Sequence, residues 1–492
     1  MKHILLICLL LSTTGSVLAQ ETFEEHRAKL AKDFSGFKST IMDDYNGFRD
    51  KILKDYCEVL KQAWESVNAI SFSKLPLENH VPPVVFSDKE RHQQEQRHPI
   101  EEIIQPEPTM PEQPTPTVPV EPIPEVTKQM FSISFMGTVM EVRKPKGALP
   151  VLRGCNSDGV AMFWEALSDR TYDGLIEDCL QLRSAHHLCD WAYLLLLREL
   201  SQYVYEQHLD EAALLMAYLY GRSGYKMRLA ITDQGQVRML YASQHSIFNK
   251  NCWTIDGTLF YAMDYDGEGI LLCNAALPHE KPLSLYVEKS QQFAVRQSGQ
   301  RELQSERYPE VRATVVGNLN LMEFFNTYPP SMVNQDACTR WAMYANTPLD
   351  ELSKQTLYPS LKDAIAVCSQ LEAAERLLNF VQTAFVYEYD DKVWGYDRAF
   401  FGEETLFYPY CDCEDRSILF SHLIRDLLGL DVVLIYYPGH LATAVHFTES
   451  VQGDYILIDG KKFTICDPTY IGAPVGYTMT GMDNSLCKVV LL

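Results

Sequence analysis

The stretch that decides the fold is CDCEDRSILFSHLIRDLLG, residues 411–429. Its apolar residues recur at helical spacing and Gly429 ends the run, so it predicts an amphipathic helix that begins at Cys413. The N-terminus of a helix stabilises an anion, and a thiol placed there can have a pKa below its ordinary value of about 8.5. Cys413 is therefore a candidate nucleophile.

Two short motifs follow this helix, PGH at 438–440 and CDPT at 466–469. Each lies at the edge of a strand-like apolar run, and a helix followed by antiparallel strands can bring the three motifs together. A thiol, an imidazole and a carboxylate are the components of an acyl-transfer site. We therefore predict catalytic roles for Cys413, His440 and Asp467, with Asp467 orienting the imidazole that deprotonates the thiol.

In these motifs the chain resembles the bacterial and archaeal transglutaminase-like superfamily, which shares the papain-type catalytic core. The resemblance covers roughly residues 370–475 and includes the lead-in FVYEYDD at 385–391. It implies an α+β fold with a papain/transglutaminase-like core, attack on an amide or related acyl carbonyl of a peptide or protein substrate, and no cofactor. Cys411 stands where the family usually has glycine, so a Cys411–Cys413 disulfide that locks the site is an alternative.

Other readings compete at each position. Cys413 could be an inert buried thiol, and the neighbouring carboxylates of Asp412 and Glu414 would raise its pKa. His446 lies on the same face of its strand as His440, six residues on, but lacks the PGH context. Asp459 competes with Asp467, but the sequence IDGK around it is typical of a hairpin turn.

A metal site is the remaining alternative for the cysteine pair. Cys411, Cys413 and His440 would supply three ligands, but zinc sites usually use a wider Cys-x-x-Cys spacing. We therefore expect no metal.

The start of the chain predicts export. Residues 1–19 combine a lysine, an apolar run and the small-residue ending VLA, as in a secretory signal peptide. The protein is then periplasmic, associated with the cell envelope, or secreted. No later apolar run reaches the ~18 residues of a membrane span, and the formal net charge of −22 argues against nucleic acid as a partner.

Residues 20–70 predict a helical arm with an eleven-residue repeat. Two series of side chains, three positions apart, should share one buried face of the helix. The arm would pack on this chain, on a second copy or on a partner. The series are Phe23, Phe34, Tyr45 and Tyr56, and His26, Phe37, Phe48 and Val59. Residues 71–128 have eight prolines between 106 and 124 and predict an extended linker without a core.

The rest of the chain predicts two tandem units, 129–330 and 331–492. An acidic residue precedes a helix and a glycine by fourteen positions in both, at Asp210–Gly224 and at Asp415–Gly429. The runs 256–264 and 459–467 also match, with Asp-Gly at the start and Asp at the end. This register aligns His208 with Cys413, Asp264 with Asp467 and, loosely, His245 with His440, so the first unit would be a degenerate copy without the nucleophile.

Two functions follow from this sequence. The first is an exported cysteine hydrolase or acyltransferase that acts on amide bonds. The second is a non-catalytic envelope binding or scaffolding protein whose triad is vestigial or locked by a disulfide. The degenerate first unit, the aromatic arm and the long linker all suit the second.

Overall fold

The computed structural model describes residues 43–70, 74–75, 81–87, 103–104, 129–333 and 336–492. Contacts divide the chain into two compact units, 1–56 and 57–492, which are considered separately. The predicted signal peptide and the first half of the eleven-residue repeat lie outside the described residues. Among the helices that are described, none combines the length and the apolar character that crossing a membrane requires.

A helix over residues 43–60 carries the described part of the repeat. Its buried positions are Arg49, Leu53, Tyr56, Cys57 and Leu60. Two members of the second predicted series, Phe48 and Val59, are 58% and 38% exposed, so the described residues of this chain do not bury that series. Each residue turns the helix by about 100°, which puts these two positions about 100° from the centre of the buried stripe.

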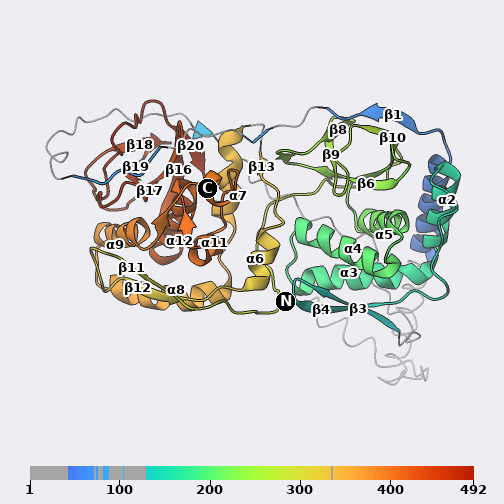
Figure 1. The fold of residues 1–492 in the computed structure, drawn as a ribbon, viewed down its shortest axis with the longest axis horizontal. Helices are drawn as coiled ribbons and strands as arrows, with labels where there is room; N and C mark the ends of the chain where they lie inside the picture. The colour runs from blue at the N-terminus through green and yellow to red at the C-terminus, as the bar shows by residue number, and fades with distance from the viewer. Residues whose placement is uncertain (1–42, 71–73, 76–80, 88–102, 105–128, 334–335) are drawn as a thin grey trace, which may run out of the picture. The chain divides into compact units, whose positions relative to one another are not determined.

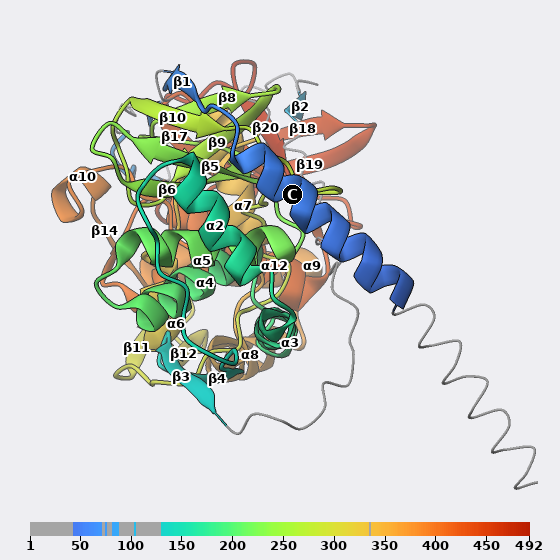
Figure 2. The ribbon, with the colours of Figure 1, turned by 90° about the vertical axis from the view of Figure 1, so that its right-hand side faces the viewer.

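The first half of the larger unit is an antiparallel sheet packed on helices (Figure 1). Helix α5 packs on β5 and β6, below the sheet in Figure 2. A separate hairpin of β3 (Met130–Phe135) and β4 (Thr138–Arg143) precedes the helices. The helices are α2 (Ser157–Leu167), α3 (Asp173–Ala185), α4 (Asp190–Tyr205) and α5 (Leu209–Arg222), and the strands are β1 (Glu65–Asn68), β5 (Met227–Thr232), β6 (Val237–Ser243), β8 (Cys252–Ile255), β9 (Thr258–Ala262) and β10 (Gly269–Cys273).

The second half packs α9 and α12 against another sheet, with α7 and α11 also against α12. The helices are α6 (Leu319–Phe325), α7 (Arg340–Asn346), α8 (Glu351–Ile365), α9 (Gln370–Thr383), α10 (Asp390–Val393), α11 (Gly402–Phe407) and α12 (Cys413–Leu428). The strands are β16 (Asp431–Tyr437), β17 (His440–His446), β18 (Tyr455–Ile458), β19 (Lys461–Cys466), β20 (Lys488–Leu491) and β2 (Ile103–Ile104). Short pairs are β7 (Ser246–Ile247) with β13 (Ser331–Met332), and β14 (Val386–Tyr387) with β15 (Tyr410–Cys411). The architecture is therefore α+β.

The two large sheets have the same strand order in the described part of the chain. One reads β8-β9-β6-β5-β10-β1 and the other β18-β19-β17-β16-β20-β2. In each, a helix leads directly into the first strand of the central hairpin. The β8–β9 and β18–β19 turns also agree in backbone conformation, since Asp256 and Asp459 both have φ of 49° before a glycine with positive φ. They differ at the outer edge, where β1 is antiparallel and β2 is parallel to its neighbour.

Several predicted boundaries are wrong. The arm predicted over 20–70 ends as a helix at residue 60, and β1 then joins the first sheet. Parts of the predicted linker pair with the second half, through β2 and through a bridge from Val85 to Ile471. The hairpin of β11 (Arg301–Gln304) and β12 (Arg312–Val315) was assigned to the first unit, but its apolar side chains pack in the core of the second.

Both faces of the second sheet are covered. An inner core joins the sheet to α8, α9 and α12. An outer core on the other face includes Tyr470, Met479 and Met482, and Val81, Val84 and Phe86 pack against it. Strand β17 is therefore buried on both faces, although its sequence alternates.

Candidate functional site

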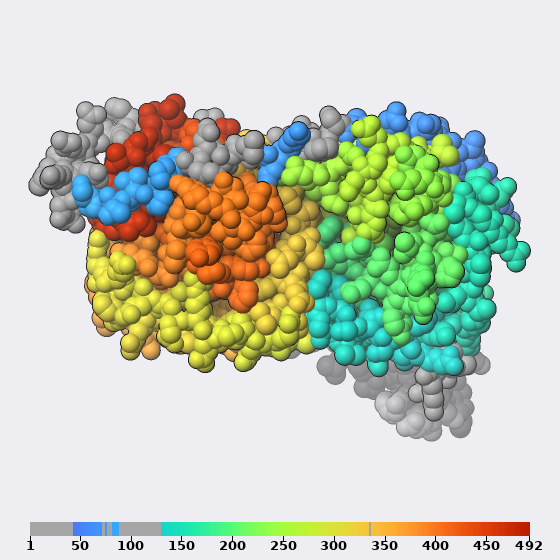
Figure 3. All heavy atoms as spheres, in the orientation of Figure 1, coloured from blue at the N-terminus to red at the C-terminus, as the bar shows by residue number. Residues whose placement is uncertain are grey.

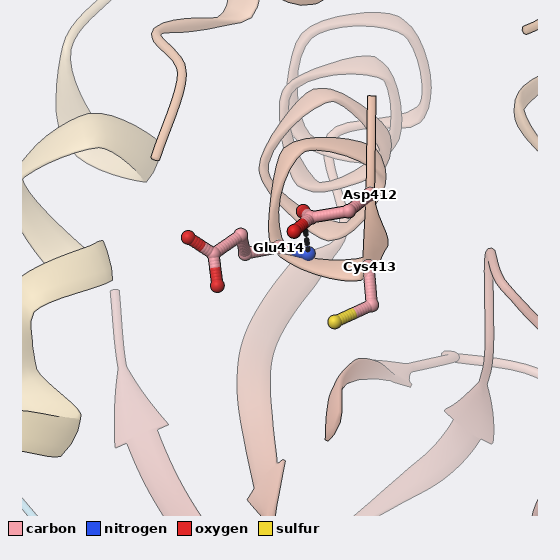
Figure 4. Close-up of side chains that lie close together, drawn as sticks. All are labelled: Asp412, Cys413 and Glu414. Atoms are coloured by element: carbon pink, nitrogen blue, oxygen red, sulfur yellow. Dashed lines mark hydrogen bonds between the residues drawn. The ribbon is translucent and has the colours of Figure 1, made fainter. Parts of the chain in front are cut away.

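Cys413 is the first residue of α12, as predicted. Asp412 is the N-cap, and its carboxylate accepts a hydrogen bond from the Glu414 N–H at 3.2 Å (Figure 4). The Asp415 carboxylate accepts one from the Asp412 N–H at 3.2 Å, which completes a capping box. Gly429 ends the helix in the left-handed conformation, with φ of 65°. The local sequence thus fixes the cysteine at a helix N-terminus, where four N–H groups lack helical partners.

His440 and Asp467 form a buried pair. His440 begins β17, Asp467 follows β19, and Nε2 of the ring lies 2.8 Å from Oδ2 of the carboxylate. The other carboxylate oxygen accepts the N–H groups of Thr469 at 2.8 Å and Tyr470 at 3.1 Å. The second ring nitrogen of His440, Nδ1, is buried and has no hydrogen-bond partner among the described residues. This nitrogen is the one left to accept a proton from a nucleophile.

A buried amide supports the turn that carries Asp467. Nε2 of Gln382, in α9, donates to the carbonyl oxygens of Asp467, Tyr470 and Ala473 at 3.1, 2.8 and 3.1 Å. The Gln382 Oε1 accepts the Gly472 N–H at 3.1 Å. Sequence reasoning missed this residue, because a glutamine inside an amphipathic helix has no local signal for a contact some 85 residues away.

A second buried side chain ties α12 to the lead-in segment. The guanidinium of Arg416 donates to the carbonyl oxygens of Gln382 and Phe385 at 3.0 and 2.8 Å. Its charged carbon also lies 5.3 Å from the centre of the Tyr387 ring. Arg416 belongs to the motif that begins at Cys413, but the sequence does not predict that its side chain binds the carbonyl groups before β14.

Cys413 and His440 line the same small pocket. Its volume is about 20 Å³, which is room for about one water molecule. The wall is aromatic and acidic. The other lining residues are Val81, Trp341, Tyr387, Asp397, Asp412, Glu414, Tyr436, Gly439 and Leu441.

The surroundings of Cys413 hold its thiol in the protonated form. Burial raises the pKa of the thiol well above its ordinary value, and the charges of Asp412, Glu414 and Asp467 raise it further. A hydrogen bond from the backbone of Leu441 opposes this shift. The helix N-terminus alone therefore does not produce the lowered pKa that the sequence predicted.

Four acidic side chains lie close together at the site, those of Asp390, Asp397, Asp412 and Glu414. Burial, followed by the charge of Asp412, raises the pKa of Asp390 to about 9. Burial and Asp397 raise the pKa of Asp412 to about 7, and the same two causes raise that of Glu414 well above its ordinary value. Oε1 of Glu414 is buried, and no described residue gives it a hydrogen bond. Arg340 partly compensates, 3.6 Å from Asp397.

Two groups of described residues could hold a metal ion. Asp390, Asp397 and Glu414 place one ligand atom each within 4.8 Å of one another, and so do Asp412, Cys413 and Glu414. The first group offers carboxylate oxygens, the ligands that calcium and magnesium prefer. Neither group contains Cys411 or His440, the partners that the sequence suggested for Cys413.

The alternative site residues lie elsewhere. His446 is at the far end of β17, where its Nδ1 lies 2.9 Å from the carbonyl of Lys462. Asp459 is exposed at the tip of the β18–β19 turn. Cys411 and Cys413 are both free thiols in the structure, and Cys411 packs in the inner core.

The corresponding position in the first half lacks these groups. His208 precedes α5 as Cys413 begins α12, and Asp264 follows β9 as Asp467 follows β19. Strand pairing makes Gln236, rather than His245, the counterpart of His440, so that part of the predicted alignment is wrong. Asp264 pairs with Arg198 instead of an imidazole.

Comparison with known proteins assigns the chain neither a family nor a function. The chain matches no family model, no curated protein and no solved structure.

Proposed function

We propose that the chain is a cysteine hydrolase or acyltransferase that acts on amide bonds of peptide or protein substrates. In this proposal residues 331–492 form a transglutaminase-like core that carries the active site. One observation supports it above all others. One ring nitrogen of His440 is hydrogen-bonded to Asp467, the other has no partner in the described part of the chain, and the ring shares a pocket with Cys413.

The reaction would proceed in two halves. The Cys413 thiol transfers its proton to Nδ1 of His440 while the sulfur attacks the carbonyl carbon. The backbone N–H at Cys413, at the start of the helix, stabilises the oxyanion. The C–N bond then breaks, and the leaving amine takes the proton from the imidazolium. Water attacks the thioester in a hydrolase, and an amine attacks it in a transamidase; His440 removes the proton of either nucleophile. The C–S bond then breaks, and the Cys413 sulfur takes this proton back from the imidazolium. Asp467 stabilises the imidazolium throughout.

We infer that residues 157–273, from α2 to β10, form a degenerate copy of the same unit, completed by strand β1. The shared strand order and the shared Asp-Gly turn support an internal duplication. The positions of the triad are taken by His208, Gln236 and Asp264, so this copy supplies no thiol and would pack or bind rather than catalyse.

We also propose export through residues 1–19. The support is the sequence pattern of these residues, which lie outside the described structure. In this proposal the enzyme works in the periplasm, at the cell envelope or outside the cell.

Covalent labelling tests the proposed reaction. A peptide carrying an electrophilic ketone should label Cys413, and His440→Ala should slow the labelling. With a peptide library as substrate, water labelled with oxygen-18 would report hydrolysis and a fluorescent amine would report transamidation. If Cys413→Ala retained either activity, the assignment of the nucleophile would be wrong.

A second candidate is a binding or scaffolding protein with a vestigial triad. Two observations favour it: the pocket has room for about one water molecule, and the pKa of the Cys413 thiol is raised well above its ordinary value. A scaffold predicts that Cys413→Ala leaves every function of the protein intact. It also predicts that no acyl-enzyme forms under any condition that exposes the pocket.

A further inference from the structure

A short segment of the predicted linker lies across the second half of the chain. Residues 81–87 run over its surface, shown in light blue in Figure 3. The Ile471 N–H donates to the Val84 carbonyl at 2.8 Å, and the Phe86 N–H donates to the Ile471 carbonyl at 2.9 Å. Val85 makes a parallel bridge to Ile471 between these bonds. The segment is therefore held through its main chain, as an added strand is held at a sheet edge.

The side chains of the segment alternate between the protein and the solvent. Val84 and Phe86 pack against the outer core, whereas Val85 between them is 72% exposed. The Phe86 ring contacts the rings of Tyr470 and Tyr477 edge to face, with centroids 5.4 and 5.0 Å apart. This alternation is that of an extended strand with one apolar face.

The same segment reaches the catalytic pocket. Val81 is one of the side chains that line the pocket of Cys413 and His440. An extended chain advances about 3.3 Å per residue, so Val81 to Phe86 spans roughly 17 Å of surface. Tyr470 and Ile471, which bind the far end, directly follow the turn that carries Asp467. The segment thus joins the pocket of the nucleophile to the turn that holds the imidazole.

We propose that the surface under residues 81–87 is the binding site for an extended, apolar polypeptide substrate, and that these residues occupy it until the substrate displaces them. The inference rests on the proposed function, since it names the substrate class of that site. Recognition would use the main chain at Ile471 and apolar side chains at alternate positions, in the places of Val84 and Phe86. This mode selects an unfolded or flexible stretch of protein, because a folded strand has its N–H groups already paired.

The residues after Val81 suit an occupant that a substrate can displace. Pro82 and Pro83 each fix φ near −65° and carry no N–H, so this part of the segment is rigid and cannot pair with the protein as a strand. A substrate with ordinary residues at these two positions would present two N–H groups that the segment lacks. The segment therefore fills the surface while making fewer bonds near the pocket than a substrate can make.

The raised pKa of the Cys413 thiol agrees with a binding site that residues 81–87 occupy. Burial is the largest cause of the raised pKa of Cys413, and the pocket beside Val81 holds about one water molecule. Displacing the segment would admit water and lower the pKa of the thiol toward its ordinary value.

Site-resolved alkylation of the full chain tests the proposal. Iodoacetamide modification of Cys413, followed by peptide mass spectrometry, should be at least about tenfold faster in Phe86→Ala than in the wild type, because the apolar anchor of the segment is lost. Val85→Ala is the matched control. It shortens an exposed side chain of the same segment and should change the rate by no more than about twofold.

A synthetic peptide separates occupancy from other effects of the substitution. The capped peptide VPPVVFS, the sequence of residues 81–87, should restore slow alkylation when added to Phe86→Ala, and VPPVVDS should not. Equal rates in Phe86→Ala and the wild type, or no protection by VPPVVFS, would overturn the proposal.

Failure of this inference is distinguishable from failure of the proposed function. Faster alkylation and peptide protection without turnover of any peptide would support the binding site and overturn the hydrolase. Equal turnover of an apolar peptide by Phe86→Ala and the wild type would support the hydrolase and overturn the occupied site.

Discussion

Replacing Gln382 by methionine tests how the protein holds the turn that carries Asp467. The Gln382 amide makes three hydrogen bonds to the carbonyl oxygens of the turn that begins at Asp467, and it accepts a fourth from the Gly472 N–H. Methionine has nearly the same length and volume but makes none of these bonds. The substitution therefore removes the polar contacts without opening a large cavity.

The loss in the free energy of unfolding depends on which polar groups are left without any hydrogen-bond partner. The carbonyl oxygens of Asp467 and Tyr470 each keep a backbone hydrogen bond, from the N–H groups of Tyr470 and Ala473. The Ala473 carbonyl and the Gly472 N–H have no other partner in the described structure. Each buried orphan costs about 1–3 kcal/mol, so we expect a loss of about 2–6 kcal/mol in the free energy of unfolding. For a domain of this size that lowers Tm by about 4 °C or more.

Urea unfolding followed by circular dichroism measures this loss. Gln370→Met is the matched control, because Gln370 begins the same helix and its side chain bonds Thr448 at the surface. We expect the control to stay within about 0.5 kcal/mol of the wild type. If Gln382→Met also stayed within that range, the four hydrogen bonds would contribute nothing and the account of the turn would be wrong.

Three further predictions concern the site itself. Asp467→Asn removes a charge-assisted hydrogen bond to the imidazole of His440. We expect this loss to outweigh the removal of the Asp467 charge near the thiol, so alkylation of Cys413 at pH 7 should slow by about 10- to 100-fold. An unchanged rate would contradict the triad. Because the pKa of Asp390 is raised to about 9, the folded protein keeps a proton that the unfolded chain releases near pH 4, and this contribution to stability is lost as the pH rises toward 9. Asp390→Asn should therefore gain stability over the wild type between pH 5 and pH 9 in urea titrations, whereas the exposed control Asp363→Asn should show no such trend. Cys411→Ala should leave alkylation of Cys413 unchanged under non-reducing conditions, since both thiols are free; an increase would indicate the disulfide lock.

The sequence predicted the parts of the site whose signals are local. The helix start at Cys413, the strand edge at His440 and the strand end at Asp467 all lie in short motifs with clear periodicity around them, and the structure has these elements. The two Asp-Gly hairpins are also a local signal, and the structure has a turn of the same backbone conformation at both places.

What the sequence could not supply depends on distant contacts. His245 was aligned with His440 on residue type, but strand pairing, which fixes the true register, makes Gln236 the counterpart. The acidic surroundings of the thiol come partly from Asp390 and Asp397, which are close only in the folded chain. Proline content predicted an unpacked linker over 71–128, yet the apolar residues of 81–86 find a complementary surface. Amino-acid composition indicates the backbone conformation that a segment prefers, but not the surface on which it packs.

The pairing of β2 with β20 has a consequence for how the protein is made. Ile103 pairs with Val489, so a strand made early in synthesis finds its neighbour only after nearly all of the intervening chain has left the ribosome. Contacts this distant in sequence form slowly, because closing a long loop costs entropy before any hydrogen bond offsets that cost. Until β20 is added, β16 is an unpaired edge of the sheet, on which strands from other chains can add. The second sheet is thus exposed to aggregation until the last residues of the chain are made, and a chaperone that shields the β16 edge would have its largest effect on yield before that point.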